Sequence, residues 1–157
     1  MTAHGLRESR LDSAIRATAF WTALVLSAFN ALSALGGGIG ILLTDGLGMP
    51  ASMLTGGPFS SFTLPGIVLL VVVGGTQVLA ATLLFTRRES APLWLAVAGF
   101  GMLVWIFVET MMIRGGSVLQ VLYFSTGSVQ LILALALLGV VAWLPRAPLS
   151  AAGRPGR

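Results

Sequence analysis

The sequence predicts an all-α fold: a transmembrane, antiparallel four-helix bundle with a long extracytoplasmic loop between the first and second helices. Two observations lead to this prediction. Hydrophobic residues make up 56% of the 157 residues and charged residues only 9%, whereas a soluble globular domain is about 25% charged. The apolar residues also gather in four stretches, and each is close to the roughly 20 residues that a helix needs to cross the hydrocarbon layer.

The four stretches define the domain organisation. The predicted spans are residues 17–43, 64–85, 93–113 and 121–144, so the transmembrane domain is 17–144. Residues 1–16 form a cytoplasmic N-terminal tail, for which two conformations are open: a short amphipathic helix on the inner membrane surface or a frayed segment. Residues 145–157 are rich in proline, glycine and arginine, a composition typical of a disordered cytoplasmic tail.

The arginines set the orientation. They lie before the first span, between the second and third, and after the fourth: Arg7, Arg10, Arg16, Arg87, Arg88, Arg146, Arg154 and Arg157. The other two connections carry only Asp45 and Arg114 as charges. The positive-inside rule therefore places both termini in the cytoplasm. The net charge of +4 reflects this orientation, and no nucleic-acid partner is expected.

The first extracytoplasmic loop is unusual in length and composition. Residues 44–66, "TDGLGMPASMLTGGPFSSFTLPG", hold five glycines and three prolines. Such a segment is too long for a simple turn, so we expect Pro50 to Thr55 to form a short helix. Phe59 and Phe62 are expected to fold this segment back over the mouth of the bundle as a lid.

A run of glycines precedes this loop. Gly36, Gly37, Gly38 and Gly40 resemble a phosphate-binding loop superficially. No strand precedes them and no basic residue follows, so they do not fit that motif. We interpret them as a place where two helices pack closely.

The residue types exclude several kinds of chemistry. The chain has no cysteine and a single histidine, and that histidine, His4, lies in the polar N-terminal tail. Disulfides, thiolate metal sites and thiol catalysis are excluded, and no metal or cofactor is expected. The spans also contain no histidine, aspartate or lysine. An enzyme is therefore not predicted.

Glu109 is the exception within the spans, in the stretch "VWIFVETMMIRGG". At about 100° per residue, the neighbours on its helix face include Ala98, Met102 and Trp105, while most of the bulky aliphatic and phenylalanine side chains fall on the opposite face. Bulky apolar side chains face lipid, so Glu109 is expected to point into the bundle, as intramembrane carboxylates usually do.

Each span offers one stripe of small or polar residues to the bundle centre. On the first span the stripe includes Ser27 and Asn30, and the second and fourth contribute Gln77 and Gln130. The predicted polar seam consists of Glu109, Asn30, Gln77, Gln130, Tyr123, Thr126 and Arg114. Two roles are open for it: hydrogen bonding between helices, or a polar path or ligand pocket.

Several segments resemble a known group of proteins. The order "GGGIGILLTDGLGMP", "MLTGGPFSSFTLPGIVLLVVVGG", "WIFVETMMI" and "LQVLYFSTG" resembles a widespread family of small bacterial four-span membrane proteins with no assigned function. The resemblance covers roughly residues 34–135. In that family the loop motif carries serine and an acidic residue where this chain has Gly57 and Ser60 or Ser61, and glutamine is frequent at the position of Glu109. The resemblance implies the four-span fold and a hydrogen-bonding role at Glu109.

Three functions are compatible with these residues. The first is a non-enzymatic bundle that binds a lipid-like molecule or accompanies a larger membrane complex. The second is a proton or cation transporter or channel subunit that uses Glu109, although proton relays usually contain several acidic residues and the spans contain only this one. The third is an intramembrane enzyme with Glu109 as general acid or base, which lacks a catalytic partner. The first is favoured, with the lipid bilayer and either a homo-oligomer or a larger membrane complex as partners.

Overall fold

The computed structural model describes residues 3–55, 57–113 and 117–139. All secondary structure in these residues is helical. In chain order the elements are α1 (Ala3–Thr44), η1 (Ala51–Leu54), α2 (Thr63–Ile67), η2 (Val68–Gly74), α3 (Gly75–Phe85), α4 (Ala91–Ile113) and α5 (Val118–Leu137). Element η1 is a 3-10 helix and η2 is a π-helix that joins α2 to α3 without a break.

Four helical segments are long and apolar enough to cross a membrane. They are Ser13–Thr44, Thr63–Phe85, Ala91–Met112 and Val118–Leu137. Many large apolar side chains on these segments point outward; Leu32, for example, is 73% exposed. Exposed apolar surface on this scale suits contact with lipid. The predicted all-helical class is confirmed, and the four segments support its membrane character.

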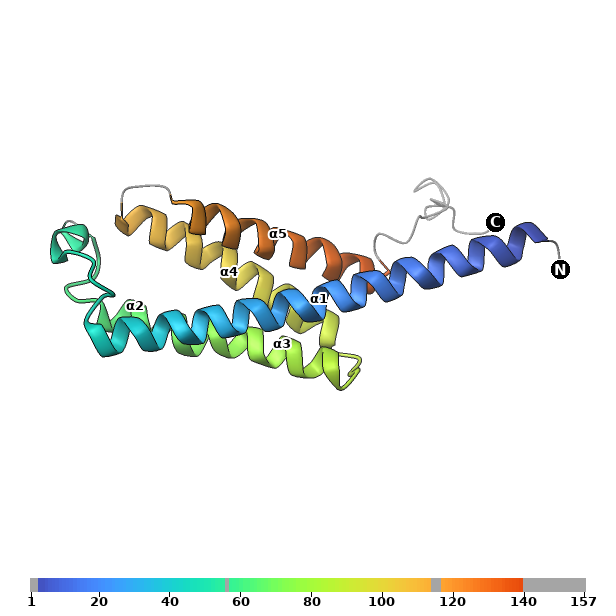
Figure 1. The fold of residues 1–157 in the computed structure, drawn as a ribbon, viewed down its shortest axis with the longest axis horizontal. Helices are drawn as coiled ribbons and strands as arrows, with labels where there is room; N and C mark the ends of the chain where they lie inside the picture. The colour runs from blue at the N-terminus through green and yellow to red at the C-terminus, as the bar shows by residue number, and fades with distance from the viewer. Residues whose placement is uncertain (1–2, 56, 114–116, 140–157) are drawn as a thin grey trace, which may run out of the picture.

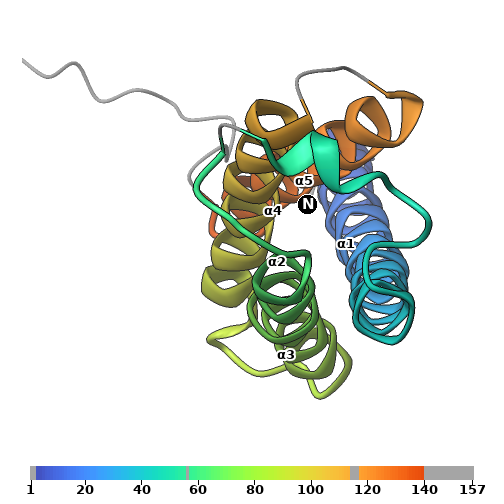
Figure 2. The same ribbon diagram turned by 90° about the vertical axis from the view of Figure 1, so that its left-hand side faces the viewer.

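The segments lie side by side along the long axis of the molecule (Figure 1). The connection from α1 to α2 and the short turn from α3 to α4 lie at opposite ends. Helix α1 packs against α3 and α5, and α4 packs against the other side of both. Helices α1 and α4 are therefore diagonal neighbours with few direct contacts, as the end-on view in Figure 2 shows.

The ends of two segments differ from the predicted boundaries. Helix α1 begins at Ala3, well before the expected start at residue 17, and it runs as one continuous helix (Figure 1). Residues 3–16 are helical and continue the first span without a break, so they form neither a separate short helix nor a frayed segment. Helix α5 ends at Leu137, earlier than the predicted residue 144. The predicted disordered tail, 145–157, lies outside the described residues.

The π-helix was not predicted from the sequence. Its wider turn leaves carbonyl groups less well aligned for regular α-helical hydrogen bonds. Thr76, two residues after its end, donates its hydroxyl to the carbonyl oxygens of Val72 at 2.8 Å and Val73 at 3.0 Å. This side chain satisfies backbone groups at the transition from η2 to α3.

Glycines set the closest helix contacts. A Cβ atom placed on Gly38 would lie 2.7 Å from the Leu70 Cβ and 2.9 Å from the Leu70 backbone nitrogen, so α1 meets η2 almost backbone to backbone. Helices α4 and α5 meet in the same way, because a Cβ on Gly99 would lie 2.9 Å from the carbonyl oxygen of Gly127. The interpretation of the glycine run before the loop as close packing is confirmed at Gly38.

The interior contains three clusters of buried apolar residues along the bundle. The cluster near the α3–α4 turn is Ala23, Leu84, Ala91, Leu95 and Ala134. The central cluster is Ala34, Val73, Met102, Trp105 and Ile106. The third, near the α1–α2 connection, is Ile41, Leu54, Phe62 and Met112. We call the first the inner apolar cluster.

The connection between α1 and α2 folds back onto the bundle. The expected short helix between Pro50 and Thr55 is present as η1. Its Leu54 and the following Phe62 are 7% and 5% exposed and pack against Ile41 and Met112, with Phe59 partly buried beside them. Residues 51–55 and 57–62 therefore cover one end of the bundle, and we call them the lid.

Candidate functional site

Five polar side chains meet inside the bundle, and we call them the polar layer: Ser27, Asn30, Gln77, Thr126 and Gln130. The first three and Gln130 are 0% exposed and Thr126 is 8% exposed. They come from α1, α3 and α5. The i, i+3 spacing of Ser27 and Asn30 and the i, i+4 spacing of Thr126 and Gln130 place each pair on one helix face.

Gln130 is at the centre of the polar layer. Its Oε1 accepts hydrogen bonds from Asn30 Nδ2 at 3.1 Å and Gln77 Nε2 at 3.0 Å. Its Nε2 donates to Gln77 Oε1 at 2.8 Å and to Ser27 Oγ at 3.0 Å. One side chain thus uses both amide hydrogens and both lone pairs of its oxygen.

The polar layer also contacts α4. Gln77 Nε2 donates to the carbonyl oxygen of Ala98 on α4 at 3.2 Å, and Thr126 Oγ1 donates to Asn30 Oδ1 at 3.1 Å. Within the described part of the chain, no buried side-chain nitrogen or oxygen lacks a hydrogen-bond partner. An unsatisfied buried amide costs about 1–3 kcal/mol. The closed geometry therefore suits a structural role that ties α1, α3, α4 and α5 together.

A cavity of about 260 Å³ lies nearer the lid, and we call it the outer cavity. Its walls come from α1, η2, α4, α5 and the turn after α1, and most of its lining is apolar. The polar side chains in the lining are Ser33, Glu109, Gln120 and Tyr123. Predominantly apolar walls with a few polar groups are typical of small-molecule sites.

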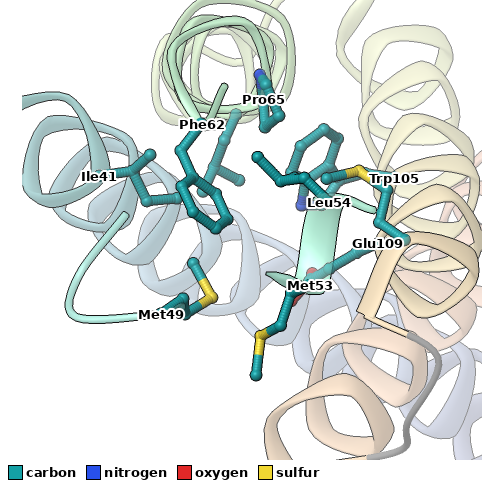
Figure 3. Close-up of a pocket in the computed structure, with 10 residues that line it drawn as sticks. Ile41, Met49, Met53, Leu54, Phe62, Pro65, Trp105 and Glu109 are labelled. Carbon is teal, nitrogen blue, oxygen red and sulfur yellow. The ribbon is translucent and has the colours of Figure 1, made fainter. Parts of the chain in front are cut away.

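A smaller cavity of about 60 Å³ adjoins it beneath the lid. Met53, Leu54 and Phe62 close this cavity from the side of the lid. Figure 3 shows Glu109 and Trp105 extending from α4 toward η1 in this cavity. Both residues line the two cavities, so the carboxyl group is accessible from each.

Glu109 and the polar layer are separated along the bundle. Glu109 is eleven residues beyond Ala98, whose carbonyl group joins the layer. At 1.5 Å per residue this is roughly 16 Å along α4. The side chain is half-buried, and among the residues that the structure describes its carboxyl group forms no hydrogen bond or ion pair.

The expected partners of Glu109 have other contacts. Thr126 donates to Asn30 and to the carbonyl oxygen of Tyr123 at 3.0 Å. The Tyr123 ring lines the outer cavity and stacks on Phe29, with 6.2 Å between ring centroids. Gln120, a further neighbour in the cavity, accepts a hydrogen bond from the Ser117 backbone nitrogen at 2.8 Å and so caps α5. Arg114 lies outside the described residues.

The predicted seam is thus divided between two places. Asn30, Gln77, Thr126 and Gln130 lie together in the polar layer, whereas Glu109 and Tyr123 line the outer cavity. A helical wheel gives the direction of a side chain but not its position along the bundle axis relative to other helices. The sequence-based prediction therefore grouped the two sets of residues into one seam. It also could not identify Met49 or Met53 as cavity residues, because loop contacts follow no period.

The polar groups of the outer cavity are few and differ in type. Within the described ranges, no three histidine, cysteine, aspartate or glutamate side chains are grouped so that they could hold a metal ion. The polar side chains that share the outer cavity with Glu109 are Ser33, Gln120 and Tyr123, and none of them is a second carboxylate or a histidine. The outer cavity can accommodate an apolar group of a ligand. The carboxyl group of Glu109, the amide of Gln120 and the phenol of Tyr123 would then lie near a polar part of the same ligand.

No family model, curated protein or solved structure matches this chain. Its function is therefore inferred from its own residues.

Proposed function

We propose that this chain is a multi-pass protein of the bacterial inner membrane and that it binds a small, mainly apolar molecule of lipid type in the outer cavity. In this proposal α1, α2–α3, α4 and α5 cross the bilayer in alternating directions as an antiparallel bundle. Both termini and the α3–α4 turn face the cytoplasm, and the lid faces the opposite side. The protein performs no covalent chemistry.

The orientation rests on the distribution of charge. Arg87 and Arg88 occupy the α3–α4 turn, and Arg7, Arg10 and Arg16 belong to the first half of α1, at the same end of the molecule (Figure 1). The α1–α2 connection at the other end carries Asp45 and no arginine. Arginine-rich segments are retained in the cytoplasm, which supports the placement of the lid outside.

The outer cavity is the observation that carries the ligand proposal. About 260 Å³ is bounded mainly by apolar residues of all four membrane-length segments, including Ala34, Leu69, Met102 and Leu119. Methionines in the walls, among them Met49, adapt to ligands of irregular shape because their side chains are flexible and polarisable. An apolar molecule of the bilayer gains contacts there without leaving a low-dielectric environment.

The rest of the bundle interior supports binding over transport. Two regions separate Glu109 from the arginine-rich end of the bundle. The first is the polar layer, whose side chains hydrogen-bond to one another, and the second is the inner apolar cluster. A proton or cation would have to pass both regions, and the inner apolar cluster offers it no side-chain ligand. This arrangement weakens the alternative of a transporter built on Glu109.

Native mass spectrometry in mild detergent tests the proposal, because it reports bound lipid, oligomeric state and copurifying subunits together. The cavity variant is Ser33→Phe, in which a large ring occupies the outer cavity. The matched control is Ala28→Phe, which places the same ring on the exposed face of the same helix. We expect the wild type and Ala28→Phe to retain a bound lipid-type molecule and Ser33→Phe to lose it while remaining folded.

Two results would contradict the ligand proposal. One is a wild-type protein free of any small molecule, and the other is equal ligand occupancy in Ser33→Phe and Ala28→Phe. A protein that is recovered only with a second polypeptide would instead favour the role of an accessory subunit.

A further inference from the structure

A second hollow lies at the opposite end of the bundle from the lid. Its volume is about 320 Å³, and its walls come from α1, the α3–α4 turn and the end of α5. It is lined by Arg16, Ala17, Phe20, Trp21, Arg87 and Leu137. Two arginines that are distant in sequence therefore share one cavity with two aromatic rings. We call it the arginine pocket.

The side chain of Arg87 contacts an aromatic ring of α1. Its guanidinium carbon, Cζ, lies 5.2 Å from the centroid of the Phe20 ring, within the range of a cation–π contact. Phe20 in turn meets Trp21 edge to face, with 5.6 Å between ring centroids. A guanidinium stacked on a ring keeps its N–H groups free at the edge of its plane, where they can bind an acceptor.

The backbone of Arg87 is also unusual. Its φ of 53° is left-handed, at the position after a helix end where glycine is normally found. The Arg87 nitrogen donates to the Leu84 oxygen and the Arg88 nitrogen donates to the Leu83 oxygen, each at 2.9 Å, which closes the end of α3. An arginine at this position has a conformational strain that glycine would avoid. Its side chain lines the pocket from a turn that these two hydrogen bonds fix.

The arginine pocket lies at the level of lipid headgroups if the bundle spans a membrane. From Arg16 to Thr44, the end of α1, the helix rises roughly 42 Å at 1.5 Å per residue. A bilayer with its headgroup layers is about 40–45 Å thick. With the lid end at one surface, Arg16 and Arg87 are then at the other, beside Trp21, a residue type that favours this interface.

We infer that the arginine pocket binds the phosphate of an anionic phospholipid headgroup. Two guanidinium groups can each donate paired N–H groups to phosphate oxygens, a geometry that arginine supplies better than lysine. Phe20, Trp21 and Leu137 provide apolar contacts for the glycerol and upper acyl region. The phosphate of a lipid with a net negative charge offsets part of the positive charge of the two arginines, whereas a zwitterionic lipid brings its own cation. This inference rests on the membrane placement proposed above but not on a ligand in the outer cavity.

The test is native mass spectrometry of the full chain ejected from nanodiscs that contain equal amounts of phosphatidylglycerol and phosphatidylcholine. The pocket variants are Arg16→Gln and Arg87→Gly, the second of which keeps the left-handed backbone at the helix end. The matched control is Arg88→Gln, the adjacent exposed arginine that does not line the pocket. Thermal unfolding in detergent with added inorganic phosphate, without lipid, forms a second arm.

We expect the wild type and Arg88→Gln to retain phosphatidylglycerol preferentially. Each pocket variant should lose about fivefold of that preference, because it removes one of the two direct arginine contacts with the phosphate, and one basic contact contributes on this scale. Inorganic phosphate should leave the unfolding temperature of the wild type unchanged.

Three outcomes would overturn the inference. Equal retention of the two lipids by the wild type would remove it, and an equal loss in Arg88→Gln would indicate diffuse surface charge. Stabilisation by inorganic phosphate that disappears in Arg87→Gly would assign the pocket to a free anion. Failure of the wild type to enter nanodiscs would instead refute the membrane placement, so the two proposals fail separately.

Discussion

The side-chain amides of Gln77 and Gln130 exchange two hydrogen bonds, of 3.0 and 2.8 Å, between α3 and α5. Both residues are fully buried. Their pairing leaves one oxygen lone pair of Gln130 for Asn30 and one N–H of Gln77 for the carbonyl group of Ala98. The reciprocal pair and its hydrogen bonds to Asn30 and Ala98 therefore connect all four long helical segments.

Gln130→Leu is expected to lower the free energy of unfolding by about 1–3 kcal/mol, because partners of Gln130 on α1 and α3 lose their hydrogen bonds inside the bundle. Thermal unfolding in detergent measures the effect. Gln77→Leu combined with Gln130→Leu should cost less than the sum of the two single changes, since it removes both partners of the reciprocal pair. Ile132→Leu, on the exposed face of α5, is the control. Strict additivity of the double variant would refute the reciprocal pair.

Gly38→Ala is expected to destabilise the bundle, whereas Gly36→Ala should leave it unchanged or stabilise it by up to about 1 kcal/mol through helix propensity. A Cβ on Gly38 would meet the backbone of Leu70 within 2.9 Å, while a Cβ on Gly36 meets no atom within 4 Å. The two variants carry the same chemical change two residues apart. Equal unfolding temperatures for the two would show that α1 and η2 do not pack this closely.

Glu109→Gln is expected to keep both folded yield and thermal stability, because no hydrogen bond or ion pair in the described part of the chain depends on the carboxylate. Liposomes that contain a pH-sensitive dye should show equal proton leak for the wild type and Glu109→Gln. A slower leak in the variant would restore the transport hypothesis. A large loss of stability would instead indicate an ion pair between Glu109 and Arg114.

The chain lacks cysteine, so single cysteines can report its orientation without background. Ser13→Cys, Ser52→Cys and Glu89→Cys place thiols on α1, on η1 and in the α3–α4 turn, and all three positions are exposed. With a membrane-impermeant maleimide added to intact cells, we expect labelling at residue 52 alone. External labelling at residue 13 or 89 would reverse the proposed orientation.

Much of the helical framework follows from the sequence because both helix period and span length are local properties. The wheel positions of Asn30, Gln77 and Gln130 predicted that they face the interior, and the three side chains do meet there. The close contact at Gly38 follows from the absence of a side chain. These features depend on residue type and spacing, which the sequence states directly.

Other features depend on how neighbouring helices are aligned, and the sequence does not state that. Glu109 was placed with Gln130 because both face inward, yet α4 carries Glu109 roughly 16 Å past the polar layer. The residues of the π-helix from Val68 to Gly74 suit an α-helix in a membrane equally well. Their composition therefore does not predict a π-helix. The pairing of Arg16 with Arg87 in one pocket requires the packing of α1 against α3.

The position of Gln130 in the chain has a consequence for biosynthesis. Ser27, Asn30 and Gln77 belong to segments that emerge from the ribosome first, but the side chain that satisfies them lies on the last helix. Until α5 is in place, these polar groups lack the side chain that satisfies them. A chain that stops after α4 would therefore have an incompletely hydrogen-bonded interior, and each such buried group costs about 1–3 kcal/mol.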